Sequence, residues 1–96
     1  MIINLTSDNF TLDTGNYYSS PFKQDTNDTF LSIGVTLGVN GDASLQSSID
    51  ETNWDDVTDS TFTCDPFGLQ SYTNGHSLLV YRIKTTQAVV SAKIVI

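Results

Sequence analysis

The chain has 96 residues, a mass of 10.5 kDa and a single cysteine, Cys64, so it can form one compact domain and cannot form an intramolecular disulfide. Eleven acidic residues against four basic ones give a net charge of −7, which argues against nucleic acid as a partner because phosphates would be repelled. The four cations are dispersed along the chain, so binding to a membrane surface is not expected either.

The composition favours strands over helices. Hydrophobic residues make up 39% of the chain and charged residues only 16%, and Thr, Ser and Asn supply the polar balance. No window has apolar residues at helical spacing between capping residues, so little or no helix is expected. The sequence predicts an all-β fold, a small antiparallel β-sandwich of immunoglobulin-like or jelly-roll-like type, that occupies residues 1–96 as one domain.

The N-terminal segment, residues 1–28, is the most polar part of the chain. A short strand is predicted at 2–6 and a turn at Thr14–Gly15. With few apolar anchors, this segment is expected to form a lightly packed edge or an arm. The first residues lack the regions of a signal peptide, and no apolar run is long enough for a membrane-spanning helix, so we expect an unprocessed chain made in a cytoplasm.

The clearest strand signal lies at 31–39, where apolar side chains occupy every second position. Asn40-Gly41-Asp42 follows and is a strong hairpin signal, because Asn and Gly both tolerate a positive φ. A second strand should then return antiparallel, with its inner face formed by Ala43, Leu45, Ser47 and Ile49.

The remaining strands are predicted from shorter patterns. Strands are expected at 54–57, 61–64, 78–84 and 89–96, and turns at Asn27–Asp28, Asn53, Pro66–Gly68 and Asn74–Gly75. In the last strand, alternation places Val90, Ala92, Ile94 and Ile96 inward and leaves Val89, Ser91, Lys93 and Val95 outside.

Catalytic chemistry is not indicated. The one histidine, His76, follows a predicted turn, and Cys64 has no evident base beside it. Acidic residues cluster in two regions, the first with Asp25, Asn27 and Asp28 and the second with Asp50, Glu51, Asp55, Asp56 and Asp59. Solvated loop carboxylates explain both clusters more simply than a Ca²⁺ site does. We therefore expect neither an enzyme nor a bound metal or cofactor.

Aromatic residues near predicted loops are the candidates for an interface with a partner: Tyr17, Tyr18, Phe22, Phe67 and Tyr72. Tyr17 and Tyr18 are adjacent, so if they lie on a strand one should be buried and the other displayed. Trp54 is expected to cover one end of the core, although a sugar-binding platform of loop aromatics is an alternative.

The segment around the second acidic region resembles a hairpin with the pattern S-x-D-G-x-x-W, which is common in small β-sandwich modules of tailed-bacteriophage virion proteins. Ser48, Asp50 and Trp54 stand at the matching positions, where they form a structural hairpin motif. Glu51 stands where the pattern usually has glycine, so a longer or differently shaped turn is expected, with the bend at Thr52–Asn53.

The resemblance extends over nearly the whole chain. Residues 14–22 and the strand from Leu31 are similar to the leading half of such modules, and Tyr81-Arg82-Ile83 and Ala92-Lys93-Ile94 are similar to their closing half.

The resemblance implies a virion structural protein, foremost a capsid decoration or cement protein that binds across major capsid subunits on the virion surface. Such a protein would stabilise the shell because it binds only the assembled state, and it could itself form a homo-trimer. The alternatives are a tail or receptor-binding accessory subunit and a carbohydrate-binding module, because discoidin-like and other sugar-binding sandwiches have a similar hairpin.

Overall fold

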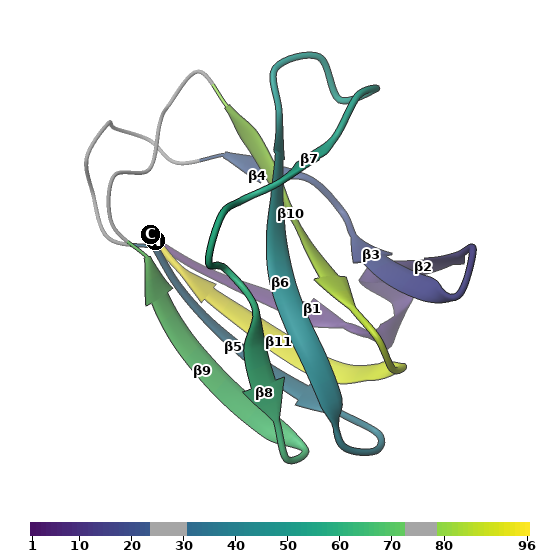
Figure 1. Cartoon of the computed structure of the whole chain (residues 1–96). Helices are drawn as coiled ribbons and strands as arrows, with labels where there is room; N and C mark the ends of the chain where they lie inside the picture. The colour runs from purple at the N-terminus through teal and green to yellow at the C-terminus, as the bar shows by residue number, and fades with distance from the viewer. Residues whose placement is uncertain (24–30, 73–78) are drawn as a thin grey trace.

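A computed structural model describes residues 1–23, 31–72 and 79–96. Two antiparallel sheets pack face to face, as Figure 1 shows. The first sheet contains, in spatial order, β1 (Ile2–Thr6), β11 (Val89–Val95), β5 (Leu31–Leu37) and β9 (Phe67–Tyr72). The second contains, in spatial order, β2 (Phe10–Asp13), β3 (Asn16–Ser19), β10 (Val80–Thr85), β6 (Gly41–Ser48) and β7 (Asp55–Asp56). Two further short strands belong to it: β4 (Phe22–Lys23) pairs with β10, and β8 (Phe62–Cys64) pairs with β6.

The predicted all-β sandwich is confirmed, and its strand order is that of a jelly roll. β3 and β4 both pair with β10, and β7 and β8 both pair with β6. If each of these two pairs is counted as one interrupted strand, every connection after β3–β4 crosses from one sheet to the other, except the one from β6 to β7–β8, which stays in the second sheet. The one helical element in the described ranges is the 3₁₀ turn η1 (Ser7–Asn9), and no helix there could cross a membrane.

The predicted hairpin at Asn40-Gly41-Asp42 is wrong, because β5 and β6 belong to different sheets. The backbone at this connection bonds instead to the neighbouring β10–β11 connection: Gly38 N–H donates to Ala88 O at 2.9 Å, and Thr86 N–H donates to Asp42 O at 3.0 Å. Gly41 has no positive φ. Glycine is needed there because a Cβ would lie 2.8 Å from side-chain atoms of Thr86 and Gln87.

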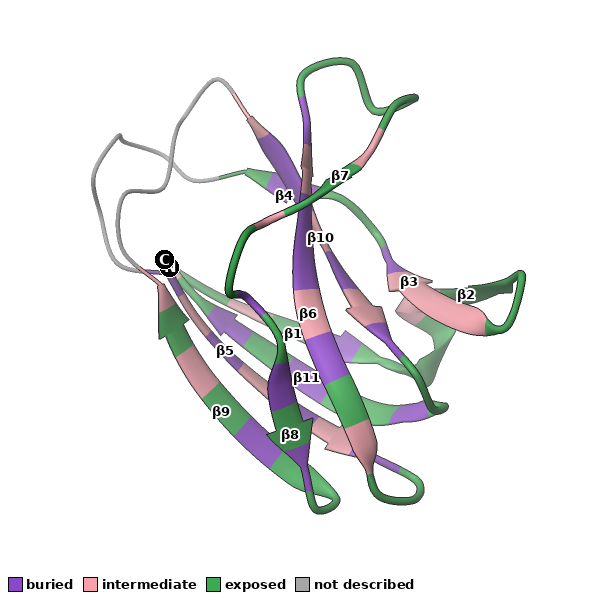
Figure 2. Ribbon diagram, in the orientation of Figure 1, coloured by how far each residue is buried: buried purple, intermediate pink, exposed green. Residues whose placement is uncertain are grey.

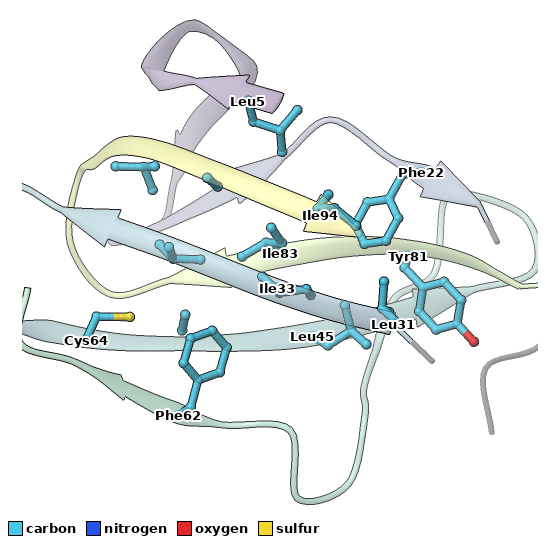
Figure 3. Close-up of a cluster of buried hydrophobic side chains, with 14 of the residues drawn as sticks. Leu5, Phe22, Leu31, Ile33, Leu45, Phe62, Cys64, Tyr81, Ile83 and Ile94 are labelled. Atoms are coloured by element: carbon cyan, nitrogen blue, oxygen red, sulfur yellow. The ribbon is translucent and has the colours of Figure 1, made fainter. Parts of the chain in front are cut away.

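The core lies between the two sheets, and Figure 3 shows its larger side chains. The inner face of β5 alternates as predicted, with every second residue from Leu31 to Leu37 buried. Opposite it, Leu45 on β6 and Ile83 on β10 are direct partners across the centre of the second sheet, and both are buried.

Two predicted inner faces are partly wrong. β6 ends at Ser48, which is buried, so Ile49 lies in the following loop and is 81% exposed, and Ser47 is only half-buried. On β11 a bulge between Val89 and Ser91 shifts the register by one residue. Val89 is therefore buried and Val90 is 58% exposed, the reverse of the prediction.

The N-terminal segment is an edge of both sheets and not a separate arm. β1 pairs along its whole length with β11, and its Leu5 is buried in the core. β2 and β3 form a hairpin at the predicted turn, where Thr14 and Gly15 both have a positive φ. Outside the described residues lie Asp25, Asn27, Asp28, Asn74, Gly75 and His76.

Two buried serine side chains complete the second sheet where its flanking strands are interrupted. Ser19 Oγ accepts the backbone N–H of Ile83 at 2.8 Å, at the break between β3 and β4. On the other side, between β7 and β8, Ser60 Oγ accepts the N–H of Leu45 at 3.1 Å and donates to its carbonyl at 3.2 Å. The central pair of strands thus keeps its hydrogen bonds although neither neighbour is continuous.

Ser60→Ala should lower the free energy of unfolding by about 1–3 kcal/mol, because the buried N–H of Leu45 would lose its partner. Denaturant unfolding measures the change. Ser91→Ala is the control, since Ser91 is exposed and should change stability by less than about 0.5 kcal/mol. Equal effects of the two substitutions would contradict this role of Ser60.

Ile33→Ala should destabilise the protein by about 2–5 kcal/mol, because Ile33 is fully buried. Val90→Ala should change stability by less than about 0.5 kcal/mol, because the bulge turns Val90 outward. A large loss of stability for Val90→Ala, measured in the same unfolding experiment, would contradict the bulge. It would instead support the predicted alternation, in which Val90 faces the core.

Candidate interaction surfaces

The outer face of the first sheet carries a shallow groove of about 520 Å³. Cross-strand registers place its lining in two rows across the four strands. One row is Asn4, Lys93, Gly34 and Leu69, and the other is Thr6, Ser91, Thr36 and Phe67. Gly34 lies between Lys93 and Leu69 in the first row and has no side chain. The side chains of Phe67 and Leu69 lie 3.5 and 3.7 Å from the position that a Cβ of Gly34 would take.

The groove is apolar on the β9 side and polar on the β1 side. Phe67 is 59% exposed and Leu69 is 65% exposed, and Val95 also contributes exposed apolar surface. The other groups are small hydroxyls, the Asn4 amide and one cation, Lys93. No carboxylate from residues 1–23, 31–72 or 79–96 lines the groove, although the chain has eleven acidic residues.

The outer face of the second sheet is organised around Arg82. Its guanidinium lies 4.1 Å from the ring centre of Tyr18 and 4.3 Å from that of Trp54, so the cation is held between two aromatic rings. Arg82 Nε donates to Gln46 Oε1 at 2.8 Å, and Gln46 Nε2 donates to Asp56 Oδ1 at 2.9 Å. Burial lowers the pKa of Arg82 below its usual value.

The sequence led us to expect that Trp54 covers one end of the core, and this prediction is wrong. Trp54 is half-buried and lies outside the cluster of core side chains. The β6–β7 connection brings Trp54 over β10, where its ring contacts the Arg82 guanidinium.

The loop between β6 and β7 is held together by Ser48 and Asp50. Ser48 Oγ accepts from the N–H of Glu51 at 2.9 Å and donates to Asp50 Oδ1 at 2.9 Å. Asp50 Oδ1 also accepts from the N–H groups of Thr52 and Asn53, both at 2.9 Å. These hydrogen bonds hold the pKa of Asp50 well below its usual range, since they favour the ionised carboxylate.

Glu51 adopts a φ of +60°, the conformation that glycine supplies in the resembling hairpin. The backbone bends over residues 49–53, which includes the predicted Thr52–Asn53, and Glu51 itself takes the positive φ. The capping bonds from Ser48 and Asp50 hold the loop firmly enough for a non-glycine residue to occupy this strained region.

The five candidate aromatic residues do not form one surface. Phe22 is buried and lies 6.0 Å from the ring of Tyr81, so it is a core residue and is not available to a partner. Tyr72 packs against the core and donates its hydroxyl to Ser60 O, and burial raises its pKa. Phe67 alone among the five is mostly exposed.

Tyr17 and Tyr18 are both half-buried, so the expected division into one buried and one displayed ring is wrong. β3 lies near the rim of the second sheet, between β10 and the edge strand β2, and neither of its faces lies fully over the core. Lys93 and Val95 were predicted to face outward, but neither they nor Leu69 and Arg82 were assigned to a surface, because their neighbours come from distant parts of the chain.

The described residues show no catalytic or metal-binding arrangement. Cys64 is buried, and burial raises the pKa of its thiol, which disfavours the nucleophilic thiolate. Within residues 1–23, 31–72 and 79–96, no three His, Cys, Asp or Glu side chains are placed to hold a metal ion. Neither a scan against protein-family models nor a search of curated proteins finds a match for this chain.

Asp50→Asn should destabilise the protein in a pH-dependent way, because the folded state binds the proton of Asp50 less tightly than the unfolded state does. The stabilisation from a depressed pKa is complete above the ordinary aspartate value of about 3.9 and declines as pH falls below it. The difference in unfolding free energy between wild type and variant should therefore be constant above about pH 5 and shrink toward pH 2.

Unfolding measured across this pH range tests the expectation. Asp55→Asn is the matched control, since its side chain is exposed and makes no hydrogen bond within the described part of the chain. A difference for Asp50→Asn that does not change with pH would contradict the stabilising role of the ionised carboxylate.

Proposed function

We propose that this chain is a structural protein of a tailed-phage virion, a decoration or cement protein that binds across major capsid subunits. The observation that carries the proposal is the groove on the first sheet, with its exposed Phe67 and Leu69 and its lack of carboxylates. Exposed aromatic and aliphatic side chains beside polar groups are typical of protein interfaces. The chain then acts by binding alone, without catalysis.

Charge supports a protein surface as the occupant of this groove. The chain carries −7 overall, yet among the described residues Lys93 is the only charged group in the groove lining. Docking through this face would bury apolar area and keep the negative charge on the outside of the particle, where repulsion between particles limits aggregation.

The fold is compatible with this role, since jelly rolls are common in viral capsid proteins. They are also common in lectins, so the fold does not decide between a capsid partner and a carbohydrate. A sugar platform requires aromatic faces that are free to stack. Tyr18 and Trp54 each use one face on Arg82, and Phe67 is the only aromatic ring in the described residues that is mostly exposed.

Co-sedimentation with empty shells tests the proposal, using shells assembled from the major capsid protein of the phage that encodes the chain. The purified chain should pellet with the shells at a fixed ratio to capsid subunits and raise their melting temperature. Phe67→Asp should weaken binding at least about tenfold, since it places a charge on the apolar side of the groove.

Leu12→Asp is the matched control. Leu12 has the same exposed fraction as Phe67, 59%, but lies on β2 at the edge of the second sheet. It should bind shells as the wild type does. A wild-type chain that stays in the supernatant would overturn the function, and equal binding by Phe67→Asp would overturn the assignment of the docking face.

A further inference from the structure

The edges of the two sheets differ in how they are protected against pairing with another chain. In the second sheet the outer strands are short and carry or adjoin acidic residues: β2 ends at Asp13, β7 consists of Asp55 and Asp56, and β8 is followed by Asp65. Short and charged edge strands discourage the addition of a further strand.

β9 at the edge of the first sheet has none of these protections. It runs for six residues, Phe67–Tyr72, without a charged residue or a proline. Its pairing with β5 is regular over all six residues, with no bulge. Figure 1 shows β9 as the outermost strand of the sheet, and Figure 2 shows exposed residues at alternate positions along it.

The hydrogen-bonding groups of Leu69 and Ser71 point away from the sheet. Pro66 O accepts the N–H of Leu37 on β5, whereas Phe67 O accepts the N–H of Asp65 on the opposite side. Since backbone groups alternate in direction along a strand, those of Leu69 and Ser71 follow Phe67 and face away from β5. Within the described residues, neither backbone has a hydrogen-bond partner on that side.

We propose that β9 pairs antiparallel with β9 of a second copy of this chain, so that the two first sheets become one continuous sheet. A twofold axis at Leu69 would place its N–H and C=O opposite those of Leu69 in the second copy, and would place Phe67 opposite Ser71. In such a symmetric pairing any charge near the axis would face a like charge. β9 carries no charged residue, so a symmetric pairing of β9 avoids this repulsion.

The side chains of β9 also favour pairing with a second copy of this chain. Phe67, Leu69 and Ser71 share the outer face of the sheet. Pairing would bring the two Leu69 side chains together, cover a residue that is 65% exposed in the monomer, and join the two grooves across the axis. This inference does not rest on the proposed function, because it concerns the purified chain by itself.

Analytical ultracentrifugation of the full chain over a range of concentrations tests the proposal. A monomer–dimer equilibrium is expected, and it should strengthen as salt rises, because each copy carries −7 and screening reduces their repulsion. Amide hydrogen exchange at Leu69 and Ser71 should slow as concentration increases, while exchange in β1 stays unchanged.

Two variants separate edge pairing from other modes of association. Leu69→Lys should raise the dimer dissociation constant at least tenfold, whereas Ile49→Lys makes the same charge change at a site 81% exposed in the β6–β7 loop and should leave it unchanged. Leu69→Pro removes the outward N–H without removing a bond to β5, and should give a folded monomer by circular dichroism.

A chain that remains monomeric at all concentrations and salt levels overturns the proposal. A dimer whose formation protects amides elsewhere, or that Leu69→Lys and Ile49→Lys affect equally, overturns it as well.

Discussion

The hydrogen bonds that Ser19 and Ser60 make to the two central strands of the second sheet are the constraint on which the rest of that sheet depends. Leu45 and Ile83 face each other at its centre, and both flanking strands are interrupted beside them. A buried N–H without a partner would oppose folding, so each interruption is possible only because a serine side chain replaces the missing backbone group. The chain can then leave the sheet between β3 and β4 on one side and between β7 and β8 on the other.

The two outer faces of the sandwich consequently have different characters. On the second sheet, Arg82 lies between Tyr18 and Trp54 and is tied through Gln46 to Asp56, so the polar and aromatic groups there are already engaged with one another. On the first sheet, the regular strands leave an apolar groove and an uncharged edge. Exposed apolar surface of this kind is what the proposed docking of the first sheet would bury.

The candidate surface could be predicted only in part. Phe67 stood out as an aromatic residue near a loop, but the reading of Pro66–Gly68 as a turn concealed β9, and with it Leu69. Arg82 gave no signal because its two ring contacts join three segments that are far apart in sequence. Ser48 and Asp50 were found by their spacing, because the bonds that hold their loop are local.

The sequence by itself determined the longer strands, such as residues 31–37 with their buried face, and the Thr14–Gly15 turn, since both are properties of adjacent residues. Only the tertiary structure decided which strands are neighbours. Backbone hydrogen bonds are alike at every residue, so a local pattern cannot choose between a hairpin and a crossing. The connection at 38–40 crosses between sheets because the β10–β11 connection supplies its hydrogen bonds, and Val90 turns outward because a bulge beside β5 changes the register.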